Sequence, residues 1–425
     1  MTTPKSLREL SCADDYDPNS MPVDKARAYI GAFLEPVAAT ERLPIRAALS
    51  RVLAAEVISP IDVPGHDNSA MDGYAVRFSD LVPAGETTLA RVGESFAGKP
   101  SPVRVGAGEA LRIFTGAVMP EGADTVVMQE RTREANGRVT IAPGAVTRAG
   151  QNSRFAGEDL KAGEVVFARG QRVRPAELGM MASLGIGEVT VYRRLRVAFF
   201  STGDELKSVG TPLAQGEIYD SNRYTLHGML QRLDCDMLDM GVVADVPEAL
   251  EQAFASAAAA ADVVITSGGV SVGEADFVKT LMDKLGEVLF WKIAMKPGRP
   301  LAYGRIQGAH FFGLPGNPVS VMVTFYAFVR DALRVLQGER DVAPLPTFKV
   351  ALAAPLRKAP GRTEFQRGIL ALDADGAWSV RTTGDQGSGI LSSMSRANCF
   401  IVLPPECGDL AAGELVDVQL LEGLV

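Results

Sequence analysis

The sequence predicts an α/β multidomain protein. We expect a doubly wound three-layer α/β domain, a helical or linker part, an inserted β-rich domain and a small C-terminal β-barrel. A chain of 425 residues exceeds what one hydrophobic core usually organises. Apolar runs alternate with helical segments after residue 194, and β-type runs without helices follow residue 346. The expected boundaries are 21–60 with 158–193 for the helical or linker domain, 61–157 for the β-rich domain, 194–344 for the α/β domain and 345–425 for the barrel.

In the helical or linker domain, apolar residues keep helical spacing over residues 23–37 and again over residues 49–53. A further helix should begin at Pro175 and stop near Gly185, because proline suits the first turn and glycine the position past the end. In the β-rich domain, Asn136 and Gly137 lie between β-type runs and predict a hairpin. Its expected strands are 103–105, 111–114, 125–128 and 139–141.

The α/β domain should contain near-continuous apolar strands, as in a sheet covered on both faces. These strands are expected at 197–200, 237–243, 263–266, 288–293 and 311–314. The helices between and after them are expected at 222–233, 247–261, 275–285 and 318–336. The barrel strands are expected at 348–352, 365–372, 378–382, 399–403 and 415–421.

The composition excludes several classes of protein. Acidic residues outnumber Lys and Arg by 51 to 43, and no basic run occurs, so nucleic acid is not an expected partner. The most apolar stretch is too short to span a bilayer, so no membrane is expected either. The four cysteines are scattered and the N-terminus lacks an apolar signal region, which predicts a cytoplasmic protein.

Three loops follow strands of the predicted α/β sheet, where ligands of open sheets usually bind. They are rich in glycine and small residues, which let the backbone approach an anion. Taken singly, each is also an ordinary tight turn or helix start, and none is a Walker loop. Three at one edge favour a ligand site. The candidate substrate-binding residues in these loops are Ser201, Thr202, Gly203, Ser267, Gly268, Gly269, Ser271, Pro315, Gly316, Asn317 and Pro318.

Charged residues accompany these loops. Lys292 at the end of a predicted strand, with Lys296 and Arg299 on the turn after it, forms a basic cluster that we interpret as an anion clamp rather than solvated surface. Glu205, Asp245 and Asp276 offer the oxygen ligands that suit Mg²⁺. Asp276 in a helix's first turn would be favourable without any metal, and for Asp245 capping is as good an explanation as catalysis.

Seven segments occur in a fixed order along the chain. They are DVPGHDNSAMDGYA from Asp62, RIFTGA from Arg112, GED from Gly157, STGDEL from Ser201, SGGVSVGEAD from Ser267, KIAMKPGRP from Lys292 and LPGNPVS from Leu314. Taken alone, the first segment is a turn-rich loop that Asx turns would explain. Together the seven resemble the MoeA-type molybdopterin molybdenumtransferases, relatives of the gephyrin E domain. The one visible departure is His66, which stands where we expect a Phe.

The resemblance implies a MogA-like α/β domain and a homodimer whose active site is shared between subunits. It implies insertion of molybdate into adenylylated molybdopterin, with Mg²⁺-dependent release of AMP. A MogA-type adenylyltransferase and apo-molybdoenzymes would be possible partners.

The resemblance also implies roles for single residues. The catalytic set would be Asp72, Asp159, Glu205, Asp245, Asp276, Lys292 and Lys296. Glu205 and Asp276 would hold the metal, while Asp72, Thr115 and Asp159 would come from the partner subunit. Pro315 and Pro318 would shape the wall of the site. A molybdate pocket would comprise Lys296, Arg299, Arg367 and Ser388.

Two rival functions remain at this stage. An adenylyltransferase would share the α/β domain, but in place of the Gly-Gly-Thr-Gly turn expected for it this chain has Gly268-Gly-Val-Ser. A scaffold would need no catalytic residues, whereas the acidic and basic positions that match the family are all present.

Overall fold

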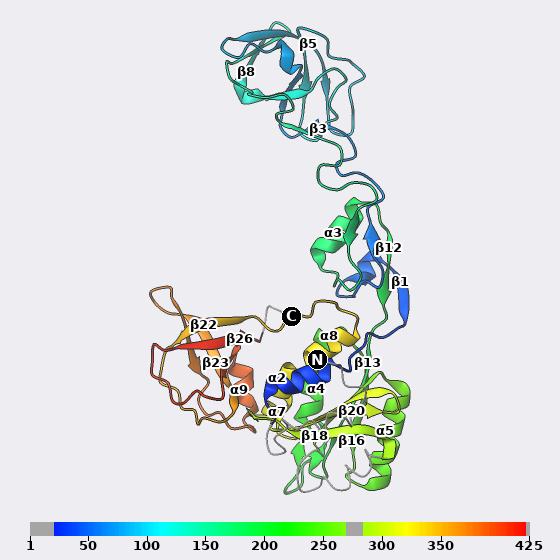
Figure 1. Ribbon diagram of the computed structural model, residues 1–425, viewed down its shortest axis with the longest axis vertical. Helices are drawn as coiled ribbons and strands as arrows, with labels where there is room; N and C mark the ends of the chain where they lie inside the picture. The colour runs from blue at the N-terminus through cyan, green and yellow to red at the C-terminus, as the bar shows by residue number, and fades with distance from the viewer. Residues whose placement is uncertain (1–20, 269–283, 422–425) are drawn as a thin grey trace.

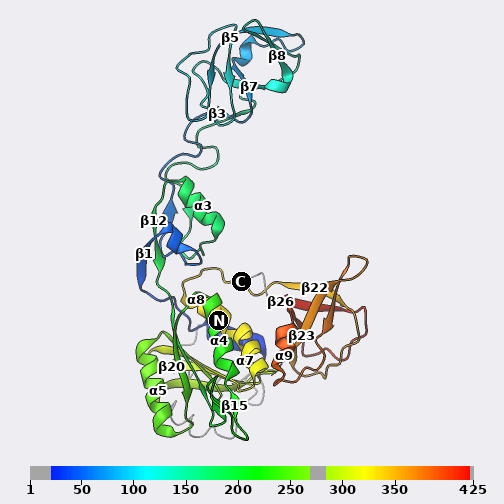
Figure 2. The same cartoon turned by 180° about the vertical axis from the view of Figure 1, so that it is seen from behind.

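The computed structural model describes residues 21–268 and 284–421, apart from the side chain of Phe290. The chain forms an elongated molecule (Figure 1). A β-rich unit lies at one end, a slender linker unit follows, and an α/β unit with a barrel beside it forms the other end. The reverse view in Figure 2 shows the same arrangement. No helix of the described residues has the length and apolar character needed to cross a membrane.

The linker unit is built around a two-stranded antiparallel ribbon of β1 (Thr40–Pro44) and β12 (Glu188–Tyr192). Its other elements are η1 (Ile45–Ala48), β2 (Val57–Ile58), β11 (Val165–Phe167) and α3 (Pro175–Ser183). Helix α3 starts at the predicted proline, and Gly185 after it has a φ of 72°. The apolar side chains of this unit pack together, since Leu53, Val173 and Met181 share one core cluster.

The helix expected over residues 49–53 is wrong. The short 3-10 helix η1 ends at Ala48, and Ser50 has a φ of 66°, which interrupts helical geometry. Val52 and Leu53 instead form β-bridges to Arg172 and Val191. The apolar spacing therefore reflects burial in a small mixed core. Helix α2 (Val23–Gly31) does form but ends before the expected residue 37, and its Val23, Ala26 and Ile30 join the core of the α/β unit.

The β-rich unit contains a six-stranded sheet in the order β7-β4-β6-β5-β9-β8. Its strands are β4 (Gly73–Val76), β5 (Thr87–Ser95), β6 (Glu109–Ile113), β7 (Thr125–Met128), β8 (Thr132–Ala135) and β9 (Arg138–Ile141). Also present are β3 (Asn68–Ser69), paired with β10 (Ser153–Arg154), and the 3-10 turns η2 (Phe78–Asp80) and η3 (Gln129–Arg131).

The predicted hairpin is confirmed. Asn136 and Gly137 have φ values of 51° and 69° and join β8 to β9. Positive φ at both central residues is what a type I′ turn requires. The strand expected at residues 103–105 does not form, although Val105 is buried and its N–H bonds to the carbonyl of Glu121.

The α/β unit contains a six-stranded sheet in the order β16-β13-β17-β21-β20-β18. The strands are β13 (Arg196–Thr202), β16 (Asp236–Val243), β17 (Val263–Ser267), β18 (Gly286–Lys292), β20 (Pro300–Ile306) and β21 (Ala309–Leu314). Strand β13 pairs in parallel with β16 and β17, and β17 pairs in parallel with β21. Strand β20 runs antiparallel to both its neighbours, β18 and β21. Strand β20 was not predicted. It follows β18 through a turn without a helix, so the strand–helix alternation gave no signal for it.

Alternate side chains of the sheet enter two different cores, which makes the unit three-layered. Val197 and Phe199 of β13 pack with α4 (Ser221–Arg232) on one face. Ala198 and Phe200 pack with α5 (Pro247–Ala260) on the other face. The predicted long helix after β21 is present as α7 (Pro318–Thr324), a π-helical turn η4 (Phe325–Val329) and α8 (Arg330–Leu336).

The C-terminal unit is a closed five-stranded barrel. Its strands are β22 (Thr347–Leu352), β23 (Thr363–Leu372), β24 (Trp378–Thr382), β25 (Cys399–Leu403) and β26 (Leu415–Leu420). The ring closes because β23 pairs with both β24 and β25. The expectation that helices are absent after residue 346 is wrong, since α9 (Leu391–Arg396) lies in this unit. Short β19 (Met295–Lys296) pairs with β23 and joins the barrel to the α/β unit.

Candidate active site

A cleft with a volume of 1090 Å³ lies beyond the carboxyl ends of the parallel strands. Residues after β13, β17 and β21 line it, together with β14 (Leu206–Lys207), β15 (Ile218–Tyr219) and the start of α4. The barrel supplies the opposite wall through residues 386–389 and Arg362. We call this the sheet-edge cleft.

The predicted strand-end residues divide into two groups. Ser201 and Ser267 are fully buried, and their hydroxyls lie 3.0 Å apart. Ser201 also donates to Asp220 Oδ1 at 3.0 Å, so it ties two strands to the start of α4. Thr202, Gly203 and Glu205 line the cleft, and so does Ser267, whereas Ser201 is not part of its wall.

Glycine is required at Gly268 for two reasons. Its φ is 89°, a conformation that side chains rarely adopt, and a Cβ atom there would lie 2.5 Å from the carbonyl oxygen of Thr202. Gly316 lies against Gly268, since a Cβ atom added to Gly316 would be 3.8 Å from the Gly268 Cα. The backbone of two predicted loops is thus closely packed at the floor of the cleft. Gly269 and Ser271 lie outside the described residues.

The loop after β21 begins a helix as predicted, with Asn317 at the N-cap and Pro318 at the first position. The Asn317 side chain forms no capping hydrogen bond within the described residues. Pro315, Gly316, Asn317 and Pro318 all line the cleft. The Gly316 carbonyl accepts a hydrogen bond of 2.6 Å from Asn222 Nδ2, which fixes this loop to α4.

One side of the cleft is acidic. Glu205 and Asp245 line it as predicted, and Asp204 and Asp220 join them. Asp220 caps α4 through Arg223 N, and its buried Oδ2 lies 3.4 Å from Arg223 Nε but has no hydrogen-bond partner among the described residues. Asp276 lies outside the described residues. Within residues 21–268 and 284–421, no three His, Cys, Asp or Glu side chains gather as a metal site.

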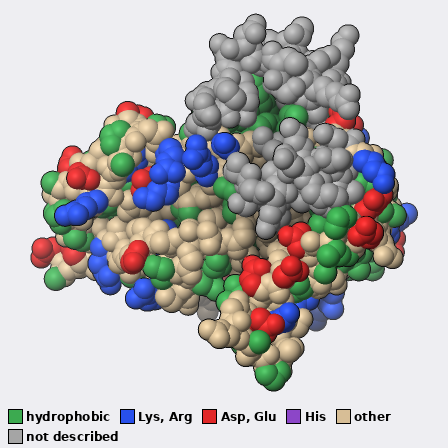
Figure 3. Space-filling model, turned by 90° about the horizontal axis from the view of Figure 1, so that it is seen from below, with side chains coloured by type: hydrophobic (Ala, Val, Ile, Leu, Met, Phe, Trp, Pro, Cys, Tyr) green, Lys and Arg blue, Asp and Glu red, His purple; other side chains and the backbone are tan. Residues whose placement is uncertain are grey.

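The facing side is basic and is made by Lys296, Arg299 and Arg362. Figure 3 views this end of the molecule and shows Lys and Arg gathered toward the barrel and Asp and Glu over the α/β unit. Lys296 Nζ lies 3.5 Å from the carboxylate of Glu364, a buried residue of the barrel. Lys292 ends β18 at the same edge of the sheet but is not part of the cleft wall.

The predicted molybdate residues are placed at two depths. Lys296, Arg299 and Ser388 line the cleft. Arg367 is 1% exposed and lies behind the loop that carries Ser388, donating to the Gly387 carbonyl at 2.9 Å and to Ser393 Oγ at 3.0 Å. Burial lowers the pKa of its guanidinium to about 10. Arg367 thus supports the shape of the wall.

The β-rich unit brings two other predicted residues together. Asp72 Oδ1 accepts hydrogen bonds from Thr115 N at 2.8 Å and Thr115 Oγ1 at 2.7 Å. These bonds lower the pKa of the Asp72 carboxyl, and Arg112 adds a smaller effect in the same direction. Asp159 is exposed and its N–H bonds to the Val63 carbonyl. The β-rich unit lies at the opposite end of the molecule from the α/β unit, as Figure 1 shows.

The other two aspartates of the Asp62 segment have structural roles. Asp62 accepts from Ala162 N and Asp67 from Ala156 N, each at 2.8 Å. They join the two chain segments that lead into and out of the β-rich unit, rather than closing Asx turns on their own backbone.

Sequence reasoning missed several cleft residues. Asp220 and Asn222 could have been found, because a strand followed by Asp-Ser-Asn and a helix is a capping signal at the correct sheet edge. Arg362 gave no usable signal, since nothing in its own segment shows that the barrel folds against the α/β unit.

Comparisons with known proteins agree along most of the chain. The family described as MoeA N-terminal region (domain I and II) matches residues 21–185. A probable molybdopterin binding domain matches residues 198–335, and MoeA C-terminal region (domain IV) matches residues 349–421.

Curated relatives and a solved structure have similar extents. A molybdopterin molybdenumtransferase of Haemophilus influenzae is 46% identical over 398 residues, covering 93% of this chain and 98% of the relative. One from Nostoc is 39% identical, covering 86% and 85%. The crystal structure of a molybdopterin biosynthesis MoeA protein from Pyrococcus horikoshii superimposes with a TM-score of 0.81 at 29% identity, over 94% of this chain and all of that one.

Proposed function

The chain belongs to the MoeA family of molybdopterin molybdenumtransferases, and from this premise we propose that it inserts molybdate into adenylylated molybdopterin with Mg²⁺-dependent release of AMP. It is a transferase of molybdenum cofactor biosynthesis. The adenylylated substrate, the metal, the dimer and the location are parts of the proposal.

The observation that carries the proposal is the charge division of the sheet-edge cleft. Its 1090 Å³ can admit a ligand larger than molybdate alone. Glu205 and Asp245 face one part of it, while Lys296 and Arg362 face another. Such a cleft can hold an anionic ligand on the basic side while a cation screens its phosphate from the acidic side.

The residues of the basic side would bind oxyanions. Lysine and arginine donate charge-assisted hydrogen bonds, which are stronger than neutral ones. Lys296 and Arg299 would orient molybdate beside the dithiolene sulfurs, converting an encounter in solution into a step within one complex. The described cysteines Cys235, Cys399 and Cys407 do not line the cleft, so the sulfur in this scheme comes from the ligand.

Magnesium fits the donor chemistry of the acidic side. Mg²⁺ keeps several waters and commonly takes one or two protein carboxylates together with substrate phosphate. Glu205 offers a carboxylate in the cleft, and Asp276 is the second expected ligand. When bound, the metal would neutralise negative charge that develops on the phosphate as AMP leaves.

We also propose that the active site is shared in a homodimer. Asp72 and Thr115 form an exposed, hydrogen-bonded pair in the β-rich unit. This unit and the α/β unit, which carries the sheet-edge cleft, lie at opposite ends of the molecule (Figure 2). A partner subunit in antiparallel orientation could bring this pair, and Asp159, to the cleft. Symmetric dimers are the commonest oligomers, and their isologous contact would complete both clefts in the same way.

A cytoplasmic location and encounters with a MogA-type adenylyltransferase and apo-molybdoenzymes complete the proposal. The location rests on the scattered, free cysteines. Cell fractionation would test it.

The decisive experiment measures AMP release from adenylylated molybdopterin with and without Mg²⁺ and molybdate, and in parallel the reconstitution of a cofactor-free molybdoenzyme. We expect molybdate-dependent AMP release that restores the enzyme's activity. Glu205→Gln should abolish both signals, whereas Glu217→Gln, which removes a carboxylate paired with Lys207, should keep them.

Rapid consumption of ATP with molybdopterin would instead support an adenylyltransferase. Ligand binding without AMP release would support a carrier or scaffold, and the proposed catalytic roles would then be withdrawn.

A further inference from the structure

A second large cleft, of 900 Å³, lies between the linker unit and the α/β unit. The linker unit contributes Ser50 and the segment 168–175, and the α/β unit contributes the ends of α4 and α8 and the loop 339–341. Helix α4 separates it from the sheet-edge cleft, because Asn222 near its start lines that cleft and Arg232 at its end lines this one. We call it the arginine cleft.

Positive charge dominates the arginine cleft. Seven arginines line it, against two lining carboxylates, Glu339 and Asp341. Two further carboxylates do not line the cleft but pair with arginines that do: Glu177 pairs with Arg174, and Asp331 pairs with Arg330. The cations therefore outnumber all these carboxylates, even though the whole chain has a net charge of -8.

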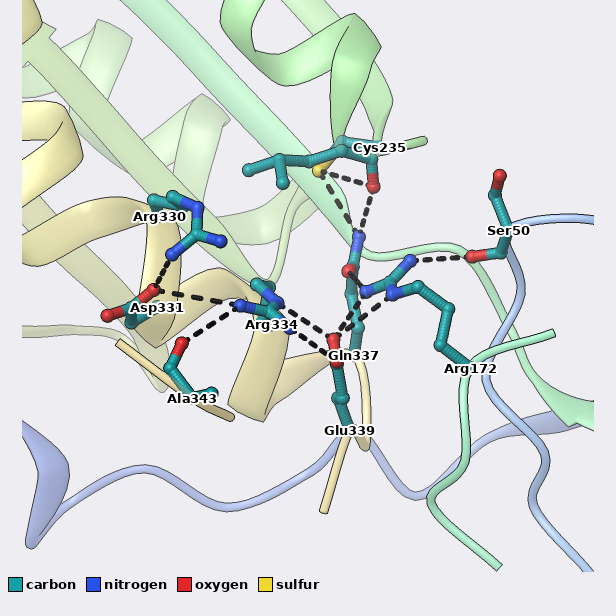
Figure 4. Close-up of polar contacts among 10 residues, drawn as sticks. Ser50, Arg172, Cys235, Arg330, Asp331, Arg334, Gln337, Glu339 and Ala343 are labelled. Atoms are coloured by element: carbon teal, nitrogen blue, oxygen red, sulfur yellow. Dashed lines mark hydrogen bonds and ion pairs between the residues drawn. The ribbon is translucent and has the colours of Figure 1, made fainter. Parts of the chain in front are cut away.

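In the inner layer of this cleft, the guanidinium groups outnumber the carboxylates that pair with them. Arg172 and Arg334 both bind Glu339, with N–O distances of 2.8 and 2.5 Å. Figure 4 shows Arg172 and Arg334 meeting at Glu339 from the two units, with Arg330 and Asp331 beside them. Asp331 also lies 4.0 Å from Arg334 Nη1, so Glu339 and Asp331 together serve three guanidiniums, which leaves excess positive charge in a half-buried layer.

Arg330 has unused hydrogen-bonding capacity. Its side chain is 4% exposed, it pairs with Asp331 through Nη1, and its buried Nε has no hydrogen-bond partner within the described residues. Burial lowers the pKa of this guanidinium, so charge here is costly without a counter-anion. A buried arginine donor that lacks an acceptor is uncommon and calls for an explanation.

The outer layer holds guanidiniums that are available to a ligand. Arg232 and Arg340 are exposed, and neither side chain makes an ion pair or hydrogen bond with the part of the chain that is described. Arg169 donates to the Tyr192 hydroxyl at 2.8 Å and pairs with no carboxylate of residues 21–268 and 284–421. Arg340 N bonds to the Gly170 carbonyl at 3.0 Å, which holds the two walls together at this point.

We propose that the arginine cleft binds a compact, multiply charged oxyanion of the polyphosphate class. Planar guanidinium groups match phosphate oxygens in bidentate geometry. No aromatic side chain lines the described cleft to stack on a base, which favours a polyphosphate over a nucleoside phosphate. The inference is independent of the proposed activity.

The bound oxyanion would connect the two units. Arg169 and Arg172 belong to the linker unit, while Arg232 and Arg340 belong to the α/β unit, so one ligand reaching both walls restrains their relative orientation. Binding should therefore raise the melting temperature, because a ligand that binds the folded state alone stabilises it by mass action.

Isothermal titration calorimetry of the full chain with sodium pyrophosphate and sodium tripolyphosphate tests the proposal, with AMP as the single-phosphate comparison. We expect saturable binding that weakens with added salt and is tighter for tripolyphosphate than for AMP. The double variant Arg232→Ala with Arg340→Ala should weaken tripolyphosphate binding by about tenfold or more, since each lost charge-assisted bond matters. The control Arg138→Ala with Arg381→Ala removes two exposed arginines elsewhere and should bind as the wild type does.

Lys296→Ala separates this site from the sheet-edge cleft, which can also attract phosphate. Binding that survives Lys296→Ala and is lost in the Arg232/Arg340 variant supports the proposal. Binding lost only in Lys296→Ala, or equal binding by both arginine double variants, overturns it.

Discussion

The ammonium group of Lys296 lies 3.5 Å from the carboxylate of Glu364, and the two residues are also direct partners in the pairing of β19 with β23. Lys296 belongs to the turn that forms the basic side of the sheet-edge cleft, whereas Glu364 belongs to the barrel. Glu364 is 3% exposed and its second oxygen accepts from Gln366 Nε2 at 3.0 Å. The barrel therefore positions a lysine of the proposed site.

Glu364→Gln should impair turnover more than folding. The amide keeps the shape of the side chain but removes the charge that holds Lys296, so we expect kcat/KM for molybdate to fall about tenfold, mainly through KM. Steady-state kinetics of AMP release with varied molybdate would measure this. As a control, Asp417→Asn breaks the exposed Lys349–Asp417 pair on the same barrel and should leave the kinetics unchanged. Equal kinetics in the two variants would contradict the positioning role.

Gly268→Ala should damage the floor of the sheet-edge cleft. The new Cβ would lie 2.5 Å from the Thr202 carbonyl oxygen at a φ of 89°. We expect a loss of about 1–3 kcal/mol in the free energy of unfolding and at least tenfold weaker binding of adenylylated molybdopterin. Gly389→Ala lies in the same cleft with nothing within 4 Å of its Cβ, and it should be tolerated. Urea unfolding and ligand titration would compare the two, and similar damage in both would argue against the close-packing explanation.

Mixed dimers should recover activity from two inactive parents. Asp72→Asn and Glu205→Gln alter the β-rich unit and the α/β unit, so one site of each mixed dimer is intact if the site is shared. Statistical mixing of equal amounts should then give about a quarter of the wild-type rate of AMP release. Co-expression with two affinity tags would isolate the mixed species. If the mixture stays as inactive as its parents, each subunit uses its own residues and the shared site is wrong.

His310 should make the protein acid-sensitive. It is buried between Tyr303 and Arg305, and burial, with a smaller effect from Arg305, lowers its pKa to about 4. Since the unfolded state takes up a proton near pH 6.5, stability is complete above that value and falls as the pH drops toward about 4. Lowering the pH from about 7.5 to about 5 should therefore reduce the free energy of unfolding by about 2 kcal/mol through this residue.

Urea unfolding of the wild type and of His310→Phe at both pH values would isolate this contribution. The variant, which has no titrating group there, should lose less stability on acidification. An equal loss in both proteins would show that other groups control the acid response.

The sequence predicted the elements whose local signals and tertiary surroundings agree. Apolar strands of the sheet, the Asn136–Gly137 hairpin and the Pro175 helix start are of this kind, because each depends on residues next to one another. Residues 49–53 failed because their apolar spacing serves a mixed core in which Ser50 has left-handed geometry.

The site was predicted where it follows from sheet topology and missed where it depends on packing between units. Thr202, Glu205 and Pro315 lie at strand ends and were found. Arg362 reaches the cleft, and Glu364 reaches Lys296, only because β23 pairs with β19, a contact between segments about 70 positions apart that no local pattern encodes.

The β-rich unit joins the linker unit through two chain segments that are hydrogen-bonded to each other. Strand β2 pairs with β11, and Val63 bridges Leu160 just beyond them. The insertion therefore leaves and returns at nearly the same point, so the linker unit could be sealed there by a short turn without losing a strand. The two units can consequently be gained, lost or exchanged as separate modules, and either one can complete its fold before the other does.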